Sequence, residues 1–265
     1  MIICFKNKEI FDVYEINENI TLVQIKISLL CRYYKYNLNW SIIIFCFNEK
    51  ENLPKVLEGV SSFVKENYIK DYEVLIVDDG STDGSLEFIQ SKVNENNKLK
   101  LLSHKHNKGI GEALRTGYLN AQFEYICAIP GDNQFDVSEL LNVKPFGDKE
   151  FVSFYRVSMY KSWYRKLIHL LNKLFNRWFL NLTIRDVNWI KVYKKNQLKT
   201  VDFELKSSII ESEICAKLSK LGVNPIELPS KYLPRAYGTP KGGTWKTVKM
   251  AIKETWALYK VVRKF

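Results

Sequence analysis

Short apolar runs alternate with longer amphipathic stretches along this chain from about residue 39 onward. Nearly continuous apolar runs of this length are typical of strands that are buried on both faces of a sheet. The stretches between them have helical periodicity. The pattern predicts strands at residues 41–47, 73–77, 99–103 and 123–129, and helices at about 52–70, 85–94 and 111–122. Strands that alternate with helices predict an α/β fold with a mostly parallel sheet flanked by helices.

The pattern also predicts how the chain is divided. Residues 1–38 alternate unevenly and predict one or two short strands, so we treat them as an N-terminal extension. Residues 39–241 form the predicted main domain, with halves at 39–150 and 151–241, and residues 242–265 form a basic amphipathic helix. No apolar stretch approaches the ~20 residues of a membrane-spanning helix. The start of the chain lacks the features of a secretory signal.

Charge is distributed unequally between the two halves of the chain. The whole sequence has 40 Lys and Arg against 29 Asp and Glu, a net charge of +11. Residues 151–265 contain 23 basic and 7 acidic residues, so this half has a net charge of +16 and residues 1–150 have one of −5. A strongly basic surface suits nucleic acid, anionic lipid or a phosphorylated substrate. Composition does not choose among these three.

The five cysteines are scattered, odd in number and without a C-x-x-C pair. This usage is typical of reduced thiols in a cytosolic protein rather than of a disulfide framework. We therefore expect the cysteines to be small buried apolar side chains.

Polar clusters follow three of the predicted strands, at Asn48–Glu49, Asp78–Asp79 and Asp132–Gln134. In open α/β sheets, ligands bind at the carboxyl ends of the strands, where these clusters lie. A single cluster of this kind is an ordinary turn or helix cap, because Asp, Asn and Ser favour those positions for local reasons. We assign that structural role to Asp83, and a functional role to Asp79 and Asp132.

Several carboxylates at one sheet edge repel each other unless a cation or hydrogen-bond donors lie between them. Mg²⁺ prefers oxygen ligands, and it is typically held by one or two carboxylates together with substrate phosphates. The expected ligand is therefore a nucleoside diphosphate joined to Asp132 through such an ion. Asp78 or Asp79 would accept a hydrogen bond from the base or the ribose.

Four segments, in this order and spacing, resemble glycosyltransferase family 2, whose members have the GT-A fold with a Rossmann-like sheet. They are IIIFCFNEKENL, EVLIVDDGSTDGS, HNKGIGEALRTGY and AIPGDNQFD. The resemblance extends from about residue 41 to residue 241. Within the family it is closest to polyprenyl-phosphate glycosyltransferases of the dolichyl-phosphate mannose synthase type.

The resemblance implies roles for residues of the acidic half. The matches to nucleotide-contacting residues are Phe45, Phe47, Glu49, Asp78 and Asp79. Asp132 and Gln134 match ligands of a divalent metal, Mg²⁺ or Mn²⁺, and Asp132 is also a predicted catalytic residue. The sequence departs from the family pattern at Pro130, which stands where the first Asp of the metal-binding segment is expected, and at Phe45, which replaces a proline.

The basic half supplies matches to phosphate-binding residues of the family. Arg156 matches an arginine that the family places after its next strand, and Arg165 matches one that neutralises the reacting phosphates. Both are predicted catalytic residues. Arg235 and Lys241 belong to a segment that resembles R-x-x-G-x-S-K, and they are predicted to bind the acceptor phosphate. Asp186 matches the acidic residue of a D-x-x-S-G-F segment. Guanidinium groups suit phosphate because their planar fork donates two parallel hydrogen bonds.

The resemblance further implies an inverting transfer from a nucleotide sugar. A hydroxyl acceptor needs a general base, whereas a lipid phosphate is already ionised and does not. Relatives that act on hydroxyls usually carry a Glu-Asp pair in the stretch corresponding to residues 209–218, where this chain has Glu211-Ser212-Glu213. This difference favours a polyprenyl phosphate acceptor, undecaprenyl or dolichyl phosphate.

Two stretches of the basic half combine an apolar face with a cationic face. The apolar positions of residues 162–182 are Tyr164, Leu167, Ile168, Leu171, Leu174, Phe175, Trp178 and Leu182. Those of the C-terminal stretch are Trp245, Val248, Ile252, Trp256, Tyr259 and Val262. Such helices lie in the membrane interface or pack on a domain core. We favour the membrane for the first stretch and leave both alternatives open for the second.

These features predict a cytoplasmic protein that is peripheral at the inner, cytosolic face of the membrane, or one that borrows a membrane-embedded partner protein. One alternative is a family 2 transferase that acts on a glycan hydroxyl in surface-polysaccharide synthesis. Another is a pseudo-enzyme, suggested by Pro130. A basic nucleic-acid-binding protein is disfavoured because no binding motif supports it. We expect His104 and His106 to be surface residues, since a third metal-ligating neighbour is missing.

Overall fold

The computed structural model describes residues 2–6, 9–13, 38–66, 69–157, 174, 176–180, 182–207, 209–237 and 245–265. Near the N terminus, β1 (Ile2–Lys6) and β2 (Glu9–Val13) pair with each other as an antiparallel hairpin, with Ile2 opposite Val13. This hairpin matches the expectation of short strands in the N-terminal extension.

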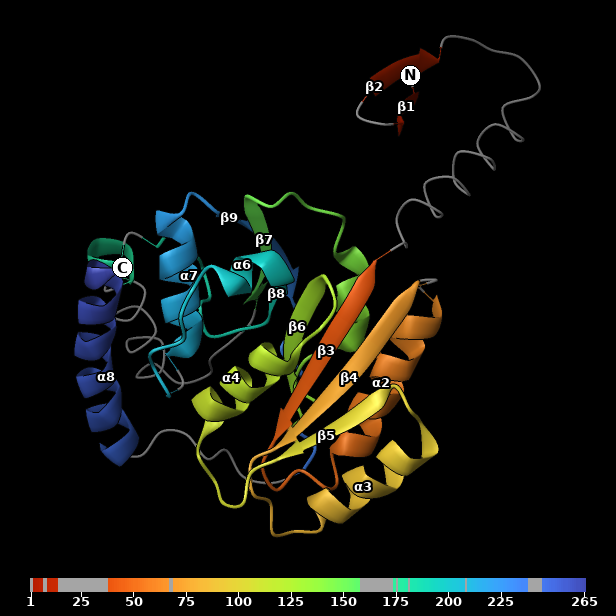
Figure 1. Cartoon of the computed structure of the whole chain (residues 1–265), viewed down its shortest axis with the longest axis vertical. Helices are drawn as coiled ribbons and strands as arrows, with labels where there is room; N and C mark the ends of the chain where they lie inside the picture. The colour runs from red at the N-terminus through yellow and green to blue at the C-terminus, as the bar shows by residue number, and fades with distance from the viewer. Residues whose placement is uncertain are drawn as a thin grey trace.

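A seven-stranded sheet forms the centre of the main domain, in the order β5-β4-β3-β6-β8-β7-β9 (Figure 1). Its strands are β3 (Asn39–Cys46), β4 (Asp71–Asp78), β5 (Leu99–Ser103), β6 (Tyr125–Pro130), β7 (Glu150–Arg156), β8 (Lys191–Lys194) and β9 (Asn224–Ser230). Every described pairing in this sheet is parallel except the two made by β8, which runs antiparallel to β6 and to β7. The predicted α/β fold with a mostly parallel sheet is confirmed.

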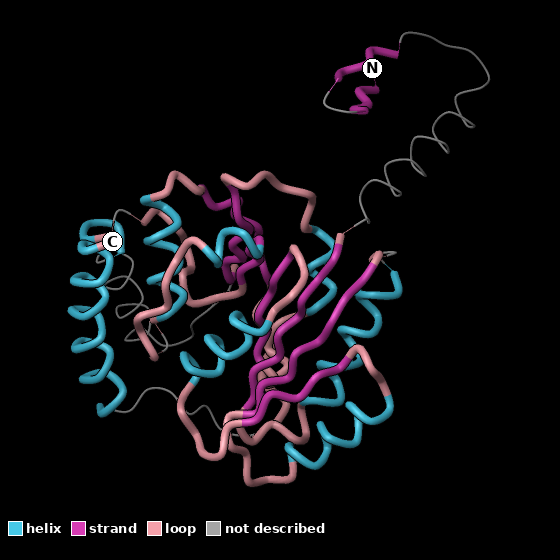
Figure 2. Tube along the Cα trace, in the orientation of Figure 1, coloured by secondary structure: helices cyan, strands magenta, loops and turns pink. Residues whose placement is uncertain are grey.

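Helices cover both faces of the sheet (Figure 2). They are α2 (Leu53–Glu66), α3 (Ser85–Glu95), α4 (Ile110–Asn120), α6 (Lys195–Lys199), α7 (Ile210–Lys220) and α8 (Trp245–Lys264), with a short 3₁₀ helix at Val137–Asn142. The core on one face contains side chains of α2, α3 and the 3₁₀ helix, and the core on the other contains side chains of α4, α7 and α8.

The middle residues of the central strands are apolar because they supply both cores. In β3, Ile42 and Ile44 face the α2 side, whereas Ile43 faces the α4 side, as the alternation of side chains along a strand requires. Helix α4 packs very closely on this strand: a Cβ atom added at Gly117 would lie 2.4 Å from Cγ2 of Ile43. The small residue at this position therefore sets how closely the helix approaches the sheet.

Part of the predicted C-terminal amphipathic helix packs on the domain. Leu258 and Val262 of α8 are buried in the core that they share with α7, and the ammonium group of Lys220 on α7 donates a hydrogen bond to the carbonyl of Val262. Trp256, two residues before Leu258, is 58% exposed. Packing on the core thus accounts for one face of the second half of α8, and an aromatic side chain remains outside it.

Candidate active site

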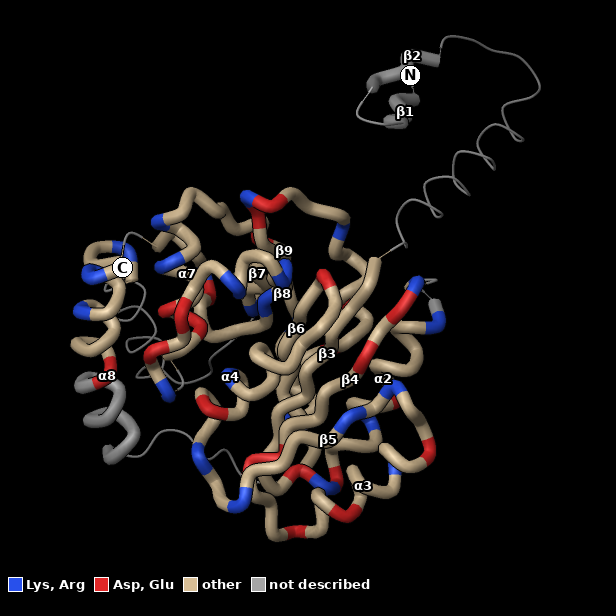
Figure 3. Tube along the Cα trace, in the orientation of Figure 1, with Lys and Arg blue, Asp and Glu red and all other residues tan. Residues whose placement is uncertain are grey.

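The three polar clusters expected at the sheet edge do lie together. Cys46 pairs with Asp78 across β3 and β4, and Phe45 pairs with Pro130 across β3 and β6, so the three strands end at the same level. The amide of Asp79 donates to the carbonyl of Cys46 at 2.9 Å, and that of Gly131 donates to the carbonyl of Phe45 at 2.9 Å. Figure 3 shows acidic residues gathered where β4 and β5 end.

Gly131 allows the loop after β6 to lie directly against β3. A Cβ atom at this position would lie 2.8 Å from Cβ of Cys46 and 3.3 Å from the carbonyl oxygen of Phe45. Real Cβ atoms do not approach that closely, so a larger residue would push the loop outward. The glycine therefore keeps Asp132, the next residue, close to the end of β3.

Arg235 joins two carboxylates from distant parts of the chain. Its Nη2 atom donates to Oε1 of Glu49, and its Nη1 atom lies 3.9 Å from Oδ2 of Asp132. Its Nε atom donates to the carbonyl of Tyr237 at 2.8 Å, and Asn52 donates to the second oxygen of Glu49 at 2.7 Å. The structure thus brings together three residues that the sequence assigned to nucleotide, metal and phosphate.

Burial and neighbouring charges act on Asp132 in opposite directions. Burial raises the pKa of its carboxyl group, and the negative charge of Glu49 adds to this effect. The amide of Gln134, which donates to Oδ1 at 3.1 Å, and the positive charge of Arg235 lower the pKa in part. Burial has the largest effect, so the pKa of Asp132 lies above its ordinary value. A cation near this carboxylate would stabilise its ionised form.

The segment that carries Arg235 is attached to the loop that carries Asp132. The side-chain amide of Gln134 donates to the Tyr232 hydroxyl at 2.7 Å, and the backbone amide of Leu233 donates to the carbonyl of Gln134 at 3.0 Å. Phe135 and Tyr232 also form an isolated antiparallel bridge. These contacts place Arg235 beside Asp132, although 103 positions separate the two residues in sequence.

Arg156, at the end of β7, is held in a bidentate ion pair with Asp186. Its Nε and Nη2 atoms donate to the two carboxylate oxygens at 2.7 and 3.0 Å. The guanidinium carbon also lies 4.6 Å from the ring centre of Trp189 and 5.5 Å from that of Tyr232. Through Tyr232 and its bond to Gln134, Arg156 is continuous with the Asp132 loop.

The pKa of Asp186 reflects this pair. Burial disfavours the charged carboxylate, but the hydrogen bonds and positive charge of Arg156 outweigh burial and hold the pKa below its ordinary value. A buried carboxylate is stable only when it is paired in this way.

Lys191 is a supporting residue that the sequence analysis missed. Its side chain is 1% exposed, and its ammonium group donates to the backbone carbonyls of Asp186, Val187 and Trp189, each at 3.0 Å. These bonds fix the loop that presents Asp186 and Trp189 to Arg156. The only local signal was a lysine at the start of a short strand, β8, and this does not reveal its partners.

Asp79 orders the loop before α4. Its Oδ1 atom accepts hydrogen bonds from Nδ1 of His104 at 2.7 Å and from the amide of Lys108 at 2.9 Å, and its Oδ2 atom accepts one from the amide of Gly109 at 2.8 Å. Nε2 of His104 lies 2.9 Å from the hydroxyl of Thr116 on α4. A direct contact between Asp79 and a nucleotide stays a prediction.

The expectation that His104 is a surface residue is wrong, since its side chain is only 6% exposed. The sequence could not show this, because the two partners of His104 lie directly after β4 and on α4. Unlike His104, His106 is exposed, as expected.

Replacing His104 by alanine should raise the KM for the nucleotide-sugar donor that the family resemblance implies about tenfold or more, because a buried hydrogen bond to a charged group contributes about 1.5–3 kcal/mol. We expect kcat to change less, since His104 positions Asp79 and does not reach the reacting atoms. Steady-state kinetics would measure this split. His104→Asn, which retains a donor near Nδ1, should recover part of the loss, and His106→Ala is the matched control. Equal effects of the two alanine variants would contradict the positioning role.

The two acidic residues of α7 have internal partners. Glu211 accepts hydrogen bonds from the hydroxyls of Tyr118 and Tyr193 at 2.5 and 2.7 Å, and burial raises its pKa above the ordinary value. Glu213 accepts from the ammonium group of Lys217 at 2.7 Å and from two backbone amides. Both carboxylates belong to the interior of the protein, so neither is placed to take a proton from an acceptor hydroxyl.

The other predicted site residues have the following positions. Asp78 is fully buried and accepts a hydrogen bond from the amide of Ser81, and Phe45 packs against the core on the α4 side. Phe47 is half-buried at the end of β3. Asp83 accepts bonds from the backbone amides of two residues, Lys50 and Ser85, as expected for a turn. Some residues singled out in the sequence lie outside the described part of the chain: Arg165, Gly238, Pro240, Lys241 and most of residues 162–182.

The oxygen donors of this site suit a divalent metal that is also bound by substrate phosphates. Within the described ranges, no group of three or more His, Cys, Asp and Glu side chains is arranged to hold an ion. Asp132 therefore supplies a single carboxylate, with the amide oxygen of Gln134 nearby in sequence. Such a donor set matches Mg²⁺ or Mn²⁺ only where substrate phosphates complete the coordination.

Comparison with known protein families shows which family has these features. The family model "Glycosyl transferase family 2" matches residues 41–199, which is more than half of the chain. The chain belongs to glycosyltransferase family 2. The matched range includes the predicted nucleotide and metal residues as well as Arg156 and Asp186, and the family assignment made from the four segments is confirmed.

Curated relatives of this family 2 chain include polyprenyl-phosphate sugar transferases. A dolichyl-phosphate beta-glucosyltransferase of Dictyostelium discoideum is 29% identical over 114 residues, which is 41% of this chain and 35% of the relative. An undecaprenyl-phosphate 4-deoxy-4-formamido-L-arabinose transferase of Proteus mirabilis is 24% identical over 217 residues, 79% of this chain and 64% of the relative. The matched regions thus span about a third to two thirds of these relatives.

Solved structures share the fold at low sequence identity. Glucosyl-3-phosphoglycerate synthase from Mycobacterium tuberculosis, crystallised with uridine diphosphate, has a TM-score of 0.60 at 14% identity, with 86% of this chain and 83% of that chain covered. The mannosyltransferase PcManGT from Pyrobaculum calidifontis, in complex with GDP-Man and Mn²⁺, has a TM-score of 0.56 at 16% identity, with 92% and 74% covered. These similarities confirm the predicted GT-A fold.

Proposed function

We propose that this protein is an inverting glycosyltransferase that moves a sugar from a nucleoside-diphosphate sugar to a polyprenyl phosphate at a membrane surface. The observation that carries the proposal is the convergence of Glu49, Asp132 and Arg235 at the carboxyl edge of a family 2 sheet. Carboxylates and a guanidinium group at one edge are suited to hold a metal and a diphosphate together.

The donor binds along the ends of β3, β4 and β6. Glu49, Asp78 and Asp79 are the proposed contacts of the base and ribose, and Asp132 with Gln134 would hold a divalent metal, Mg²⁺ or Mn²⁺. When bound, the metal neutralises charge on the departing diphosphate. The chemistry of the donor set supports this assignment, as does the burial of Asp132, which favours a neighbouring cation.

Arginine side chains hold the phosphates of donor and acceptor. Arg156 is oriented by Asp186 and the Trp189 ring, so little side-chain freedom is lost when it meets an anion. Arg235, now bonded to Glu49 and close to Asp132, binds phosphate from the other side of the site. Arg165 and Lys241 join this group by their match to the family pattern.

The acceptor is a phosphate oxygen and not a sugar hydroxyl. A hydroxyl would need a general base, and the two acidic residues that are candidates for this role, Glu211 and Glu213, have internal partners. An ionised lipid phosphate attacks without such a base. The names of the curated relatives, which are dolichyl-phosphate and undecaprenyl-phosphate transferases, agree with this acceptor class.

An exposed aromatic and basic surface supports work at a membrane. Trp178 and Phe179 are 76% and 53% exposed, and Trp256 also faces outward, with exposed Arg177 and Lys260 as their neighbours. Tryptophan and basic side chains of this kind are favoured at a lipid–water interface. We infer a peripheral position at the cytosolic face, alone or beside a membrane-embedded partner protein. None of the helices in the described part of the chain is long and apolar enough to cross a bilayer.

A transfer assay tests this function directly. The full chain would be incubated with a panel of labelled nucleotide sugars and a polyprenyl phosphate, with Mg²⁺, with Mn²⁺ or with a chelator. We expect a lipid-linked sugar whose anomeric configuration is opposite to that of the donor, with loss of product on metal removal and recovery when metal is restored. Transfer only to oligosaccharide hydroxyls would replace the proposal with the glycan alternative, and metal-independent transfer would overturn the role of the ion.

A further inference from the structure

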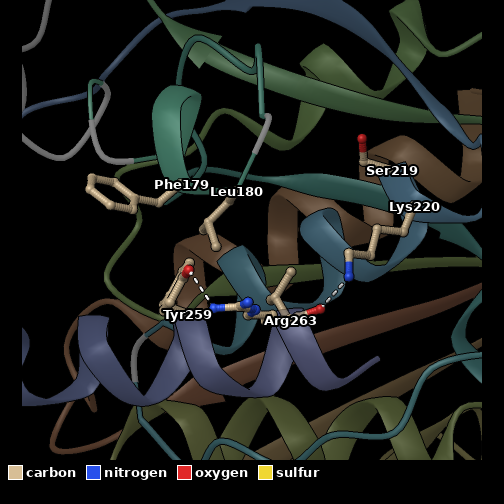
Figure 4. Close-up of a pocket in the computed structure, with 7 residues that line it drawn as sticks. Phe179, Leu180, Ser219, Lys220, Tyr259 and Arg263 are labelled. Atoms are coloured by element: carbon tan, nitrogen blue, oxygen red, sulfur yellow. Dashed lines mark hydrogen bonds between the residues drawn. The ribbon is translucent and has the colours of Figure 1, made fainter.

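A pocket lies between α7, α8 and residues 179–180, and the proposed transfer does not use it (Figure 4). Its volume is about 350 Å³. The lining residues are Phe179, Leu180, Ser219, Lys220, Tyr259, Val262 and Arg263. Pockets of this volume accept a small ligand or the headgroup of a lipid.

The lining combines hydrogen-bond donors and positive charge with an apolar wall. Lys220 and Arg263 are both cationic, and none of the described lining residues is acidic. Lys220 donates to the carbonyl of Val262 at 2.6 Å, and Nη1 of Arg263 donates to the Tyr259 hydroxyl at 3.3 Å. An ammonium group has three N–H donors and a guanidinium has five, so each side chain has more donors than these bonds use. The pocket therefore favours an anion.

An aromatic rim connects this pocket with the exposed surface. The Tyr259 ring meets Phe179 edge to face at 5.9 Å between centres, and it stacks on Trp256 at 5.5 Å. The Lys260 ammonium group lies 5.9 Å from the Trp256 ring centre. Aromatic rings beside cations form the pattern that proteins place at the level of lipid headgroups.

We propose that this pocket binds the phosphate of an anionic membrane phospholipid, with Lys220 and Arg263 holding the phosphate and Phe179 contacting the start of the acyl chains. The proposal rests on the membrane location in the proposed function, but not on its chemistry. Charge complementarity selects the occupant, because two cations among described lining residues that include no acidic side chain suit an anionic headgroup and not a neutral lipid.

The pocket lies apart from the strand ends where the donor is proposed to bind. It lies beside the C-terminal end of α8, at the upper left of Figure 1. Strands β3 and β4 end near the bottom of that figure, and Asp132 follows β6, the strand that pairs with β3. A lipid bound here would orient the protein on the membrane and would not be consumed in the reaction. We therefore expect it to control membrane binding and not the chemical step.

Vesicle binding tests the pocket. The full chain would be sedimented with phosphatidylcholine vesicles, and with the same vesicles after part of the lipid is replaced by phosphatidylglycerol. We expect the Lys220→Gln, Arg263→Gln double variant to bind the anionic vesicles about 25-fold more weakly, since each basic contact contributes about fivefold. The control is the Lys55→Gln, Lys70→Gln double variant, which loses the same charge from exposed positions on α2 and before β4.

Equal losses in the two double variants would indicate diffuse electrostatics and overturn the proposal. Ser219→Phe, which fills the pocket without changing charge, should also remove most of the preference for anionic vesicles, and a retained preference would reject the pocket. Inorganic phosphate should displace the protein from vesicles only weakly. Tight binding of free phosphate in the absence of lipid would overturn the lipid as the ligand.

Transfer to a detergent-solubilised polyprenyl phosphate separates this proposal from the proposed function. There the Lys220→Gln, Arg263→Gln variant should match the unmodified chain, and a strong loss of transfer would assign the pocket to the reaction and refute the proposal. Failure of transfer by the unmodified chain, together with the expected vesicle results, would refute the proposed function and leave the lipid site intact.

Discussion

Replacing Asp132 by alanine is expected to lower the rate of sugar transfer by about a hundred- to a thousandfold, the loss typical when one group that stabilises charge in the transition state is removed. Asp132 is the one carboxylate among residues 130–134, the segment that matches the metal-binding segment of the family, since Pro130 stands at the other expected position. No neighbouring carboxylate of that segment can replace it. Turnover with saturating Mg²⁺ and donor would measure the loss.

The controls for Asp132 separate chemistry from folding. Asp132→Asn keeps the size of the side chain and removes its charge, so it should lose nearly as much activity as the alanine variant. Asp148→Ala, at an exposed position on the same half of the chain, should leave transfer unchanged. Both Asp132 variants should unfold in urea like the unmodified protein, because Arg235 keeps its bond to Glu49. Normal transfer by Asp132→Ala would disprove the assigned role.

Replacing Asp186 by alanine should reduce the free energy of unfolding by about 3–5 kcal/mol, the cost typical of leaving one member of a buried ion pair without its partner. Arg156 would lose both of its bonds to the carboxylate. Transfer should fall as well, because Arg156 would no longer be oriented toward the phosphates. Urea denaturation and turnover would measure the two effects separately.

The pH dependence gives a second test of this pair. Arg156 lowers the pKa of Asp186 in the folded state, so the pair contributes its full stability above the pKa of the unfolded carboxyl, about 3.9. That contribution is lost as the pH falls through the lower folded-state pKa. The difference in stability between the unmodified protein and Asp186→Ala should therefore shrink in acid. A difference that does not change down to low pH would contradict the ion pair.

A double variant distinguishes support of the fold from binding of phosphate. Arg156→Ala with Asp186→Ala removes both charges, and it should recover much of the stability that Asp186→Ala loses. It should not recover transfer, since the arginine is absent. Arg185→Gln, which changes an exposed arginine paired with Glu227, is the control with little effect on either quantity. Recovery of transfer by the double variant would show that Arg156 is only structural.

The sequence alone predicted the parallel half of the sheet and the edge where the site lies. Strand segments that serve two cores must be apolar, and residues 42–46 of β3 and 74–77 of β4 show this in their order. Polar residues after such strands meet at one edge, because parallel strands end there together. Asp132 and Glu49 were found in this way, and the four ordered segments identified the family.

Tertiary structure alone decided which charged residues meet. Arg235 bonds with Glu49 across 186 positions of sequence, and His104 meets Asp79 across 25. Lys191 is buried and donates to backbone carbonyls of the Asp186 loop, whereas the sequence pattern assigned it no role. Local patterns report periodicity and turn chemistry, which depend on neighbouring residues. The partner of a buried charge depends on chain segments that only the folded protein brings together, because an unpaired charge is too costly to bury.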